Sequence, residues 1–160
     1  MIKGLIKKDH IGIVVPDMTE AINFFKKFFN AKIIGKANNF SSDDDWMKEH
    51  LNVNPRAVIE KLTLIQLFDD SIIELFQYTS PDQKKEVSKN SDYSGYHIAF
   101  EVNDIEESVS FLKRNNIKVC GSYTYNNPSL KNISGALKGV KWIYFESPWG
   151  MTFELTQKNN

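Results

Sequence analysis

The sequence predicts an α+β protein built from two copies of one β-α-β-β-β unit. Residues 9–35 align with residues 96–121, and His10 falls on His97 at an offset of 87 residues. The same offset matches further residues of similar type: Asp17 with Asp104, Ile22 with Val109, and Phe24 with Phe111. Repetition at a fixed offset indicates that one supersecondary unit occurs twice.

Each copy opens with an expected strand. Apolar residues occupy alternate positions over five residues: Ile11, Ile13 and Val15 in the first copy, and Ile98, Phe100 and Val102 in the second. A period of two is typical of a strand with one buried face.

A helix is expected next in each copy. Asp17 precedes Glu20 by three residues and Asp104 precedes Glu107 by three, which resembles a capping box with aspartate as the cap. Side chains then fall on one helical face: Met18, Ala21, Ile22 and Phe25, and in the second copy Ile105, Ser108, Val109 and Leu112. Asn30 and Asn115–Asn116 are expected to end the helices, because asparagine tolerates the left-handed conformation.

Three more strands are expected in each copy: Lys32–Gly35, Arg56–Phe68 and Ser71–Tyr78, then Lys118–Tyr123, Lys141–Glu146 and Met151–Gln157. The segment Ala37–Asn54 is expected to be a long loop, and such loops are usually functional or mobile. We expect one domain over residues 1–160, with repeats at 5–80 and 94–158 and a polar linker at 80–94.

Composition excludes several classes of function. Twenty basic and 20 acidic side chains give a formal net charge of zero, so no basic surface for nucleic acid is expected. One cysteine, Cys120, cannot form an internal disulfide. No stretch approaches the roughly 20 apolar residues of a membrane span, and the N-terminal apolar part is too short for a signal peptide. We therefore expect a cytoplasmic protein without a membrane or nucleic-acid partner.

Four residues at equivalent places could bind a metal. Strand parity places His10 and His97 on the face opposite the apolar residues that pack under the helices. Glu74 and Glu154 each lie inside an apolar run on the last strand of their copy, where a carboxylate is costly unless it is paired, protonated or bound to a metal. Each one alone could be a surface residue. Together, two imidazoles and two carboxylates could supply four ligands to one divalent cation.

Other residues could line a pocket. Phe76 shares its facing with Glu74, and Trp142 shares its facing with Tyr144, although these aromatic residues are expected to be core. Trp46 could close over a ligand from the long loop. His50 lies outside the repeat and is expected to be structural or on the surface.

At these residues the sequence resembles the vicinal oxygen chelate superfamily, which includes glyoxalase I, methylmalonyl-CoA epimerase, extradiol dioxygenases, and fosfomycin and bleomycin resistance proteins. The resemblance is clearest in three stretches: DHIGIVVPDMTEAINFF, GYHIAFEVNDIEESVSFL and YFESPWGMTFEL. It implies two βαβββ modules that form an open β-barrel around a metal, often in a homodimer. Its ligand positions are occupied here by His10, Glu74, His97 and Glu154.

The resemblance implies a divalent-metal-dependent lyase or isomerase that removes a proton next to a carbonyl of a small-molecule substrate. Zinc, nickel, cobalt, iron or manganese would suit the ligands. Glu154 is the first candidate for the base and Glu74 the second. Methylmalonyl-CoA epimerase typically has Gln where this chain has Glu74, and glyoxalase I usually has an Arg that the first strand lacks. The alternative is a non-catalytic small-molecule-binding or resistance module of the bleomycin resistance type.

Overall fold

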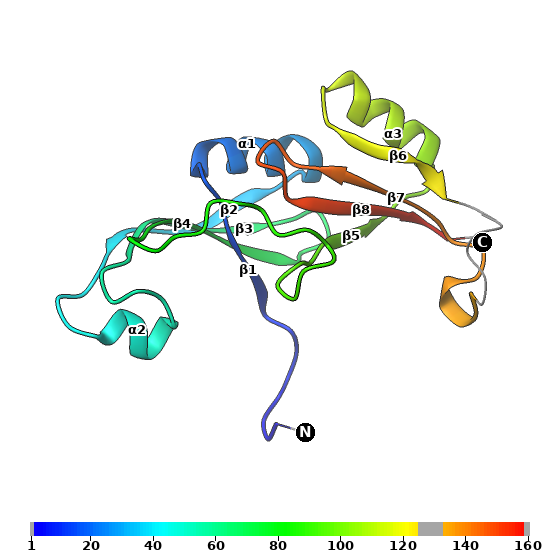
Figure 1. Cartoon of the computed structure of the whole chain (residues 1–160). Coiled ribbons are helices and arrows are strands. Elements are labelled where there is room, and N and C mark those ends of the chain that lie inside the picture. The colour runs from blue at the N-terminus through cyan, green and yellow to red at the C-terminus, as the bar shows by residue number, and fades with distance from the viewer. Residues whose placement is uncertain (1, 125–132, 159–160) are drawn as a thin grey trace. The chain divides into compact units, whose positions relative to one another are not determined.

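The computed structural model describes residues 2–124 and 133–158, which form two compact units at residues 1–85 and 86–160. Each unit holds one copy of the repeat (Figure 1). Among the described residues, no helix has both the length and the apolar character needed to cross a membrane.

The first unit contains four strands and two helices in chain order: β1 (His10–Val14), α1 (Met18–Phe29), β2 (Lys32–Phe40), α2 (Trp46–Leu51), β3 (Val58–Gln66) and β4 (Ile72–Thr79). Its sheet has the order β1-β4-β3-β2. Strand β1 is parallel to β4, and the other two pairings are antiparallel. The first strand of the unit therefore lies beside the last one.

The second unit repeats this plan: β5 (Ile98–Glu101), α3 (Ile105–Arg114), β6 (Val119–Thr124), a short 3-10 helix η1 (Gly135–Leu137), β7 (Lys141–Glu146) and β8 (Thr152–Gln157). The sheet order is β5-β8-β7-β6, again with the first strand parallel to the last. The predicted α+β fold with two βαβββ modules is confirmed. Enclosure of a metal by the two sheets depends on how the units are placed, and it stays a prediction.

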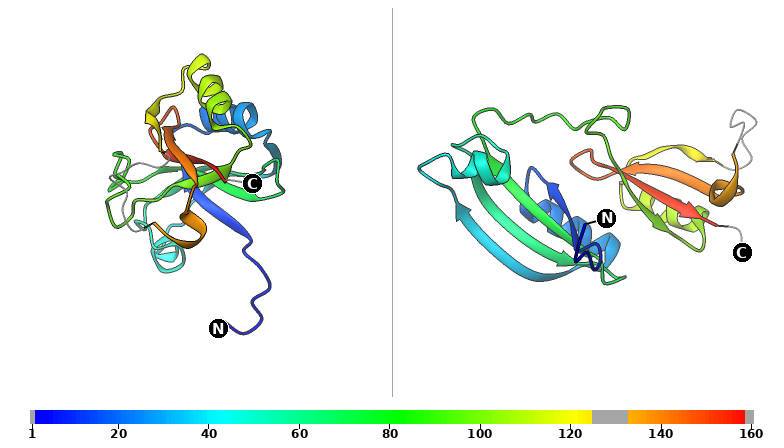
Figure 2. Two further views of the ribbon diagram at one scale, coloured as in Figure 1. Left: turned by 90° about the vertical axis from the view of Figure 1, so that its right-hand side faces the viewer. Right: turned by 90° about the horizontal axis from the view of Figure 1, so that it is seen from below.

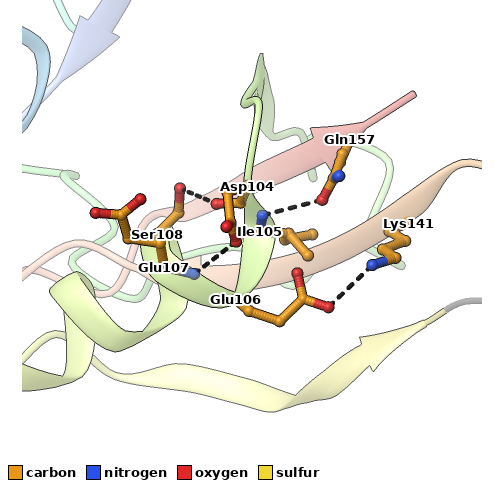
Figure 3. Close-up of polar contacts among 7 residues, drawn as sticks. All are labelled: Asp104, Ile105, Glu106, Glu107, Ser108, Lys141 and Gln157. Carbon is orange, nitrogen blue, oxygen red and sulfur yellow. Dashed lines mark hydrogen bonds and ion pairs between the residues drawn. The ribbon is translucent and has the colours of Figure 1, made fainter. Parts of the chain in front are cut away.

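The helix of each module begins with two repeated hydrogen bonds. Asp17 Oδ1 accepts from Glu20 N at 2.7 Å and Asp104 Oδ1 from Glu107 N at 2.9 Å, so both predicted aspartate caps are confirmed. In addition, a glutamine from the last strand accepts from the first N–H of each helix: Gln77 Oε1 from Met18 N at 2.9 Å, and Gln157 Oε1 from Ile105 N at 3.0 Å (Figure 3). These bonds join the start of each helix to the strand that carries the candidate glutamate.

The core of each unit lies between the sheet and its long helix (Figures 1 and 2). In the first unit the fully buried side chains include Ile13, Phe25, Ile73 and Leu75, and in the second Ile105, Ile143, Phe145 and Phe153. Residues alternate in exposure along β1, where Ile13 is buried and its neighbours Gly12 and Val14 are exposed. The predicted facing is thus confirmed, and the opposite face of each sheet carries the candidate ligands.

The segment Ala37–Asn54 is not the long irregular loop that the sequence suggested. Strand β2 continues to Phe40, which pairs with Ile59 on β3. Helix α2 then buries Met47 against Ala57 and Ile59. Sequence periodicity missed this helix because it has only six residues, too few for a repeating apolar pattern.

Candidate metal centre

His10 and Glu74 meet on the exposed face of the first sheet. Glu74 on β4 pairs with Gly12 on the parallel strand β1, and His10 lies two residues before Gly12, so both side chains point to the same face. His10 Nε2 lies 3.3 Å from Glu74 Oε2, with 39% of the histidine side chain and 20% of the glutamate side chain exposed. Strand pairing thus places one imidazole against one carboxylate.

His97 and Glu154 form the equivalent pair in the second unit. Glu154 on β8 pairs with Ala99 on the parallel strand β5, and His97 again lies two residues earlier. His97 Nε2 lies 3.0 Å from Glu154 Oε2. On the parallel neighbouring strand, the residue beside each glutamate is small, Gly12 in the first unit and Ala99 in the second.

A third group contacts His10 from the other side of its ring. His10 Nδ1 donates to Asp9 Oδ2 at 2.7 Å. This hydrogen bond is the main reason why the pKa of His10 is raised above 6.5; burial opposes the shift, and the charges of Glu74 and Asp9 add to it. The repeat position of Asp9 in the second unit is Tyr96, which carries no carboxylate.

Tyr144 lies beside the second pair. It faces Glu154 across the antiparallel β7–β8 ladder, and its ring centroid is 5.1 Å from that of His97 in an edge arrangement. Burial, and then the charge of Glu154, raise the pKa of Tyr144, so its phenol stays protonated at neutral pH. Trp142 packs against Tyr144 at 5.4 Å. Both are half-buried on the site face instead of lying in the core as expected.

In the first unit, aromatic residues cover the far end of the same face. Phe76 and Tyr78 follow Glu74 along β4 and stack at 5.4 Å. They pack with the cluster around Met47 under helix α2. Burial, and then the charge of Glu74, raise the pKa of Tyr78.

Trp46 belongs to this cluster and is not an exposed lid residue, which corrects the expectation from the sequence. Its ring stacks on His50 at 4.5 Å, and His50 Nδ1 lies 3.1 Å from the Trp46 carbonyl oxygen. Arg56 donates to the carbonyl oxygens of Asp43 and Asp44 at 2.8 and 2.6 Å and so fixes the chain before α2. His50 is therefore a structural surface residue.

An open cavity of about 700 Å³ lies within the first unit between α2, the turn after it, and the chain that follows β4. Val14 and Tyr78 line it, and both share the strand face of His10 and Glu74. Its other walls carry polar side chains, among them Lys48, Asn52, Asn54, Gln83 and Lys84. No sequence pattern predicted this cavity, because residues from three separated segments form it.

Each pair offers one nitrogen and one oxygen atom of the kinds that bind divalent ions. Nitrogen and oxygen ligands that each lie about 2.0–2.2 Å from one ion, at tetrahedral or octahedral angles, are about 3.0–3.4 Å apart. The two nitrogen-to-oxygen distances, 3.3 and 3.0 Å, fall in that range, which is also the range of a direct ion pair between histidine and glutamate. Within either unit, the described residues offer no cluster of three or more His, Cys, Asp or Glu side chains that could hold an ion. The meeting of all four ligands at one ion therefore remains a prediction.

Comparison with known proteins agrees with this fold. Residues 9–129 match the family model for the glyoxalase/bleomycin resistance protein/dioxygenase superfamily. A 2-epi-5-epi-valiolone epimerase of an Actinomyces species is 31% identical over 157 residues, which cover 96% of this chain and 80% of that protein.

Two solved structures share the fold at low sequence identity. A glyoxalase family protein from Bacillus cereus is 21% identical with a TM-score of 0.72, covering 100% of this chain and 99% of that one. The fosfomycin resistance protein FosX from Listeria monocytogenes, in complex with Mn(II) and sulfate, is 19% identical with a TM-score of 0.56, covering 99% and 95%. The resemblance noted from the sequence is confirmed, and the chain belongs to the glyoxalase/bleomycin resistance protein/dioxygenase superfamily, the vicinal oxygen chelate proteins.

Proposed function

We propose that this chain is a divalent-metal-dependent epimerase that removes and returns a proton at a carbon next to a carbonyl group. The observation that carries the proposal is the pair of equivalent His–Glu contacts on the exposed faces of the two sheets. The epimerase relative, 31% identical over nearly the whole chain, supports this reaction type. Its name describes a change of configuration in a ketone, so we propose a small hydroxylated ketone as the substrate class.

His10, Glu74, His97 and Glu154 would hold the ion, with both units contributing to one domain over residues 1–160. A bound ion would act as a Lewis acid toward the carbonyl oxygen and stabilise the negative charge left by the proton. Zinc, nickel, cobalt, iron and manganese all suit these ligands. The Mn(II) bound by FosX supports the use of a divalent ion.

Epimerisation requires a proton to leave one face of the carbon and a proton to arrive on the other. Glu154 is proposed as the base that removes the proton, and Glu74 as the group that returns it. Glu154 has the more enclosed side chain, 14% exposed against 20% for Glu74, and the Tyr144 ring borders its face of the sheet. Enclosure favours proton transfer to substrate over exchange with water.

A lyase of the glyoxalase I type would use the same kinds of ligand. The exposed face of β1 presents Gly12 and Val14 beyond His10, and neither is a cation that could bind a glutathione carboxylate. This observation favours the epimerase over the lyase. A homodimer is part of the proposal, as the family resemblance implies.

The first test is metal content by inductively coupled plasma mass spectrometry on untagged protein. We expect about one ion per chain in the wild type and in His50→Ala, which removes a histidine outside the proposed centre, and loss of the ion in His97→Ala. Wild-type protein that neither contains nor takes up a divalent ion would refute the proposal.

The second test is proton exchange with solvent, followed by deuterium incorporation into hydroxylated ketones. Glu154→Gln should abolish exchange, while the matched substitution Glu101→Gln, on an exposed side chain of the same unit, should leave it unchanged. Ligand binding that survives complete metal removal, without any exchange, would instead favour a non-catalytic binding module.

A further inference from the structure

The two histidines of the proposed centre are held in different ways. The His10 ring lies between two carboxylates, with Nδ1 at 2.7 Å from Asp9 and Nε2 at 3.3 Å from Glu74. His97 has Glu154 at its Nε2 and the edge-on Tyr144 ring beside it. Both units thus share the histidine–glutamate pair. In the first unit Asp9 also contacts the other ring nitrogen, whereas the equivalent position in the second unit is Tyr96, which has no carboxylate.

A neutral imidazole carries its proton on only one nitrogen, and the nitrogen without a proton is the one that can bind a metal. An ionised carboxylate can only accept hydrogen bonds. Glu74 is a carboxylate as well, but its oxygen lies 3.3 Å from Nε2, whereas Asp9 lies 2.7 Å from Nδ1. In the neutral ring the shorter bond to Asp9 therefore favours the proton on Nδ1, and the lone pair of Nε2 then faces Glu74. Turning the ring would break the bond to Asp9.

We propose that Asp9 is a positioning residue for the metal centre: its hydrogen bond to Nδ1 selects the tautomer and ring orientation in which His10 Nε2 binds the ion. This inference rests on the proposed function. Asp9 contacts neither the substrate nor the ion, and acts through His10 alone. Removing such a partner behind a metal-binding histidine typically lowers metal affinity about 10- to 100-fold.

The Asp9 side chain is 76% exposed, so water competes for its hydrogen bond. We therefore expect a loss near the lower end of that range, about 10-fold, in Asp9→Ala. Asp9→Asn should lose less, because the amide oxygen still accepts from Nδ1. His97 has no carboxylate at the equivalent position, so Tyr96→Phe should leave affinity within twofold of wild type.

Asp70→Asn is the matched charge control. It removes one exposed negative charge at the β3–β4 turn, where Asp70 has a φ of 64°, a conformation that asparagine adopts readily. Asp70 Oδ1 accepts from Gln66 at 3.0 Å, and an asparagine oxygen can keep that bond. If Asp9 acted only through its negative charge, Asp70→Asn would also lower the metal affinity. If Asp9 acts through its hydrogen bond to the His10 ring, Asp70→Asn should leave the metal affinity unchanged.

The test has two readouts. Calorimetric titration of metal-free protein with Zn²⁺ and Mn²⁺ measures affinity in the wild type and the variants. Long-range ¹H–¹⁵N spectra of the metal-free protein report the tautomer of His10. The spectra are recorded at a pH well above the raised pKa of His10, where the ring is neutral. There we expect the Nδ1–H tautomer in the wild type and in Asp70→Asn, and a mixture of tautomers in Asp9→Ala.

Failure of the role of Asp9 and failure of the proposed function would give different results. Equal affinity in wild type and Asp9→Ala, or an equal loss in Asp70→Asn, would overturn the role of Asp9 and leave the metal centre standing. An Nε2–H tautomer in the wild type would do the same. Failure of the wild type to bind either ion would overturn the proposed function, and the role of Asp9 with it.

Discussion

Gly95 is expected to be irreplaceable because the backbone of the preceding turn occupies the space of a side chain. A Cβ added to Gly95 would lie 2.0 Å from the carbonyl oxygen of Lys89 and 2.9 Å from its carbonyl carbon. Both are backbone atoms, so neither can rotate away. Gly95→Ala must therefore open the turn that leads into His97.

The cost of opening follows from the hydrogen bonds that hold the turn. Gly95 N donates to Asp92 O at 2.8 Å and Asp92 N donates to Lys89 O at 3.0 Å. Lys89 N donates to Asp92 Oδ2 at 2.8 Å, and the hydroxyls of Ser88 and Ser94 lie 2.9 Å apart. A hydrogen bond contributes about 1 kcal/mol net, so loss of these four predicts a destabilisation of about 4 kcal/mol at most.

Urea unfolding at pH 7 measures this destabilisation, and metal titration measures its effect on His97, two residues further on. Gly12→Ala is the control: its Cβ would meet Phe76 Cε2 at 3.7 Å, an ordinary contact, and the second unit already has Ala99 at the equivalent position. We expect Gly12→Ala to stay within about 0.5 kcal/mol of wild type. A Gly95→Ala variant with wild-type stability and metal affinity would refute the reasoning.

Three further predictions concern stability. Met47→Ala should destabilise the protein by about 2–5 kcal/mol in urea unfolding, because the fully buried side chain holds α2 on the sheet, and a smaller change would mean that α2 contributes little. Gln157→Leu should cost about 0.5–1.5 kcal/mol in the same assay by removing the acceptor for Ile105 N, and an unchanged value would mean that water replaces the amide (Figure 3). The hydrogen bond from the Ser71 hydroxyl lowers the pKa of Asp69 below 3.8. This bond therefore stabilises the folded protein above pH 3.8, and the stabilisation is lost as the pH falls through the folded-state pKa of Asp69. Ser71→Ala should thus be less stable than wild type at pH 7, and the difference in unfolding free energy should shrink as the pH falls through the folded-state pKa of Asp69. A difference of constant size over that pH range would contradict this linkage.

The sequence alone determined the elements that depend on local pattern. Alternation along residues 10–15 and 97–102 gave the strands and their facing, and aspartates three residues before glutamates gave the helix starts. The offset of 87 residues gave the second module once the first was recognised. The strands and helix starts were predictable because strand parity, helical periodicity and capping depend on residues that are close together in the sequence.

Tertiary structure decided what depends on residues far apart in the chain. The parallel pairing of β1 with β4 brings His10 to 3.3 Å from Glu74, across more than 60 residues of sequence. Gln77 reaches the start of α1, and Trp46 enters a cluster with Tyr78 instead of remaining exposed. The contact between Asp9 and His10 was also not predictable from the sequence, because in an ideal strand adjacent side chains point to opposite faces. Asp9 precedes the first residue of β1, and its side chain turns back to His10. Non-local pairing and packing set these contacts, and no local pattern in the sequence encodes them.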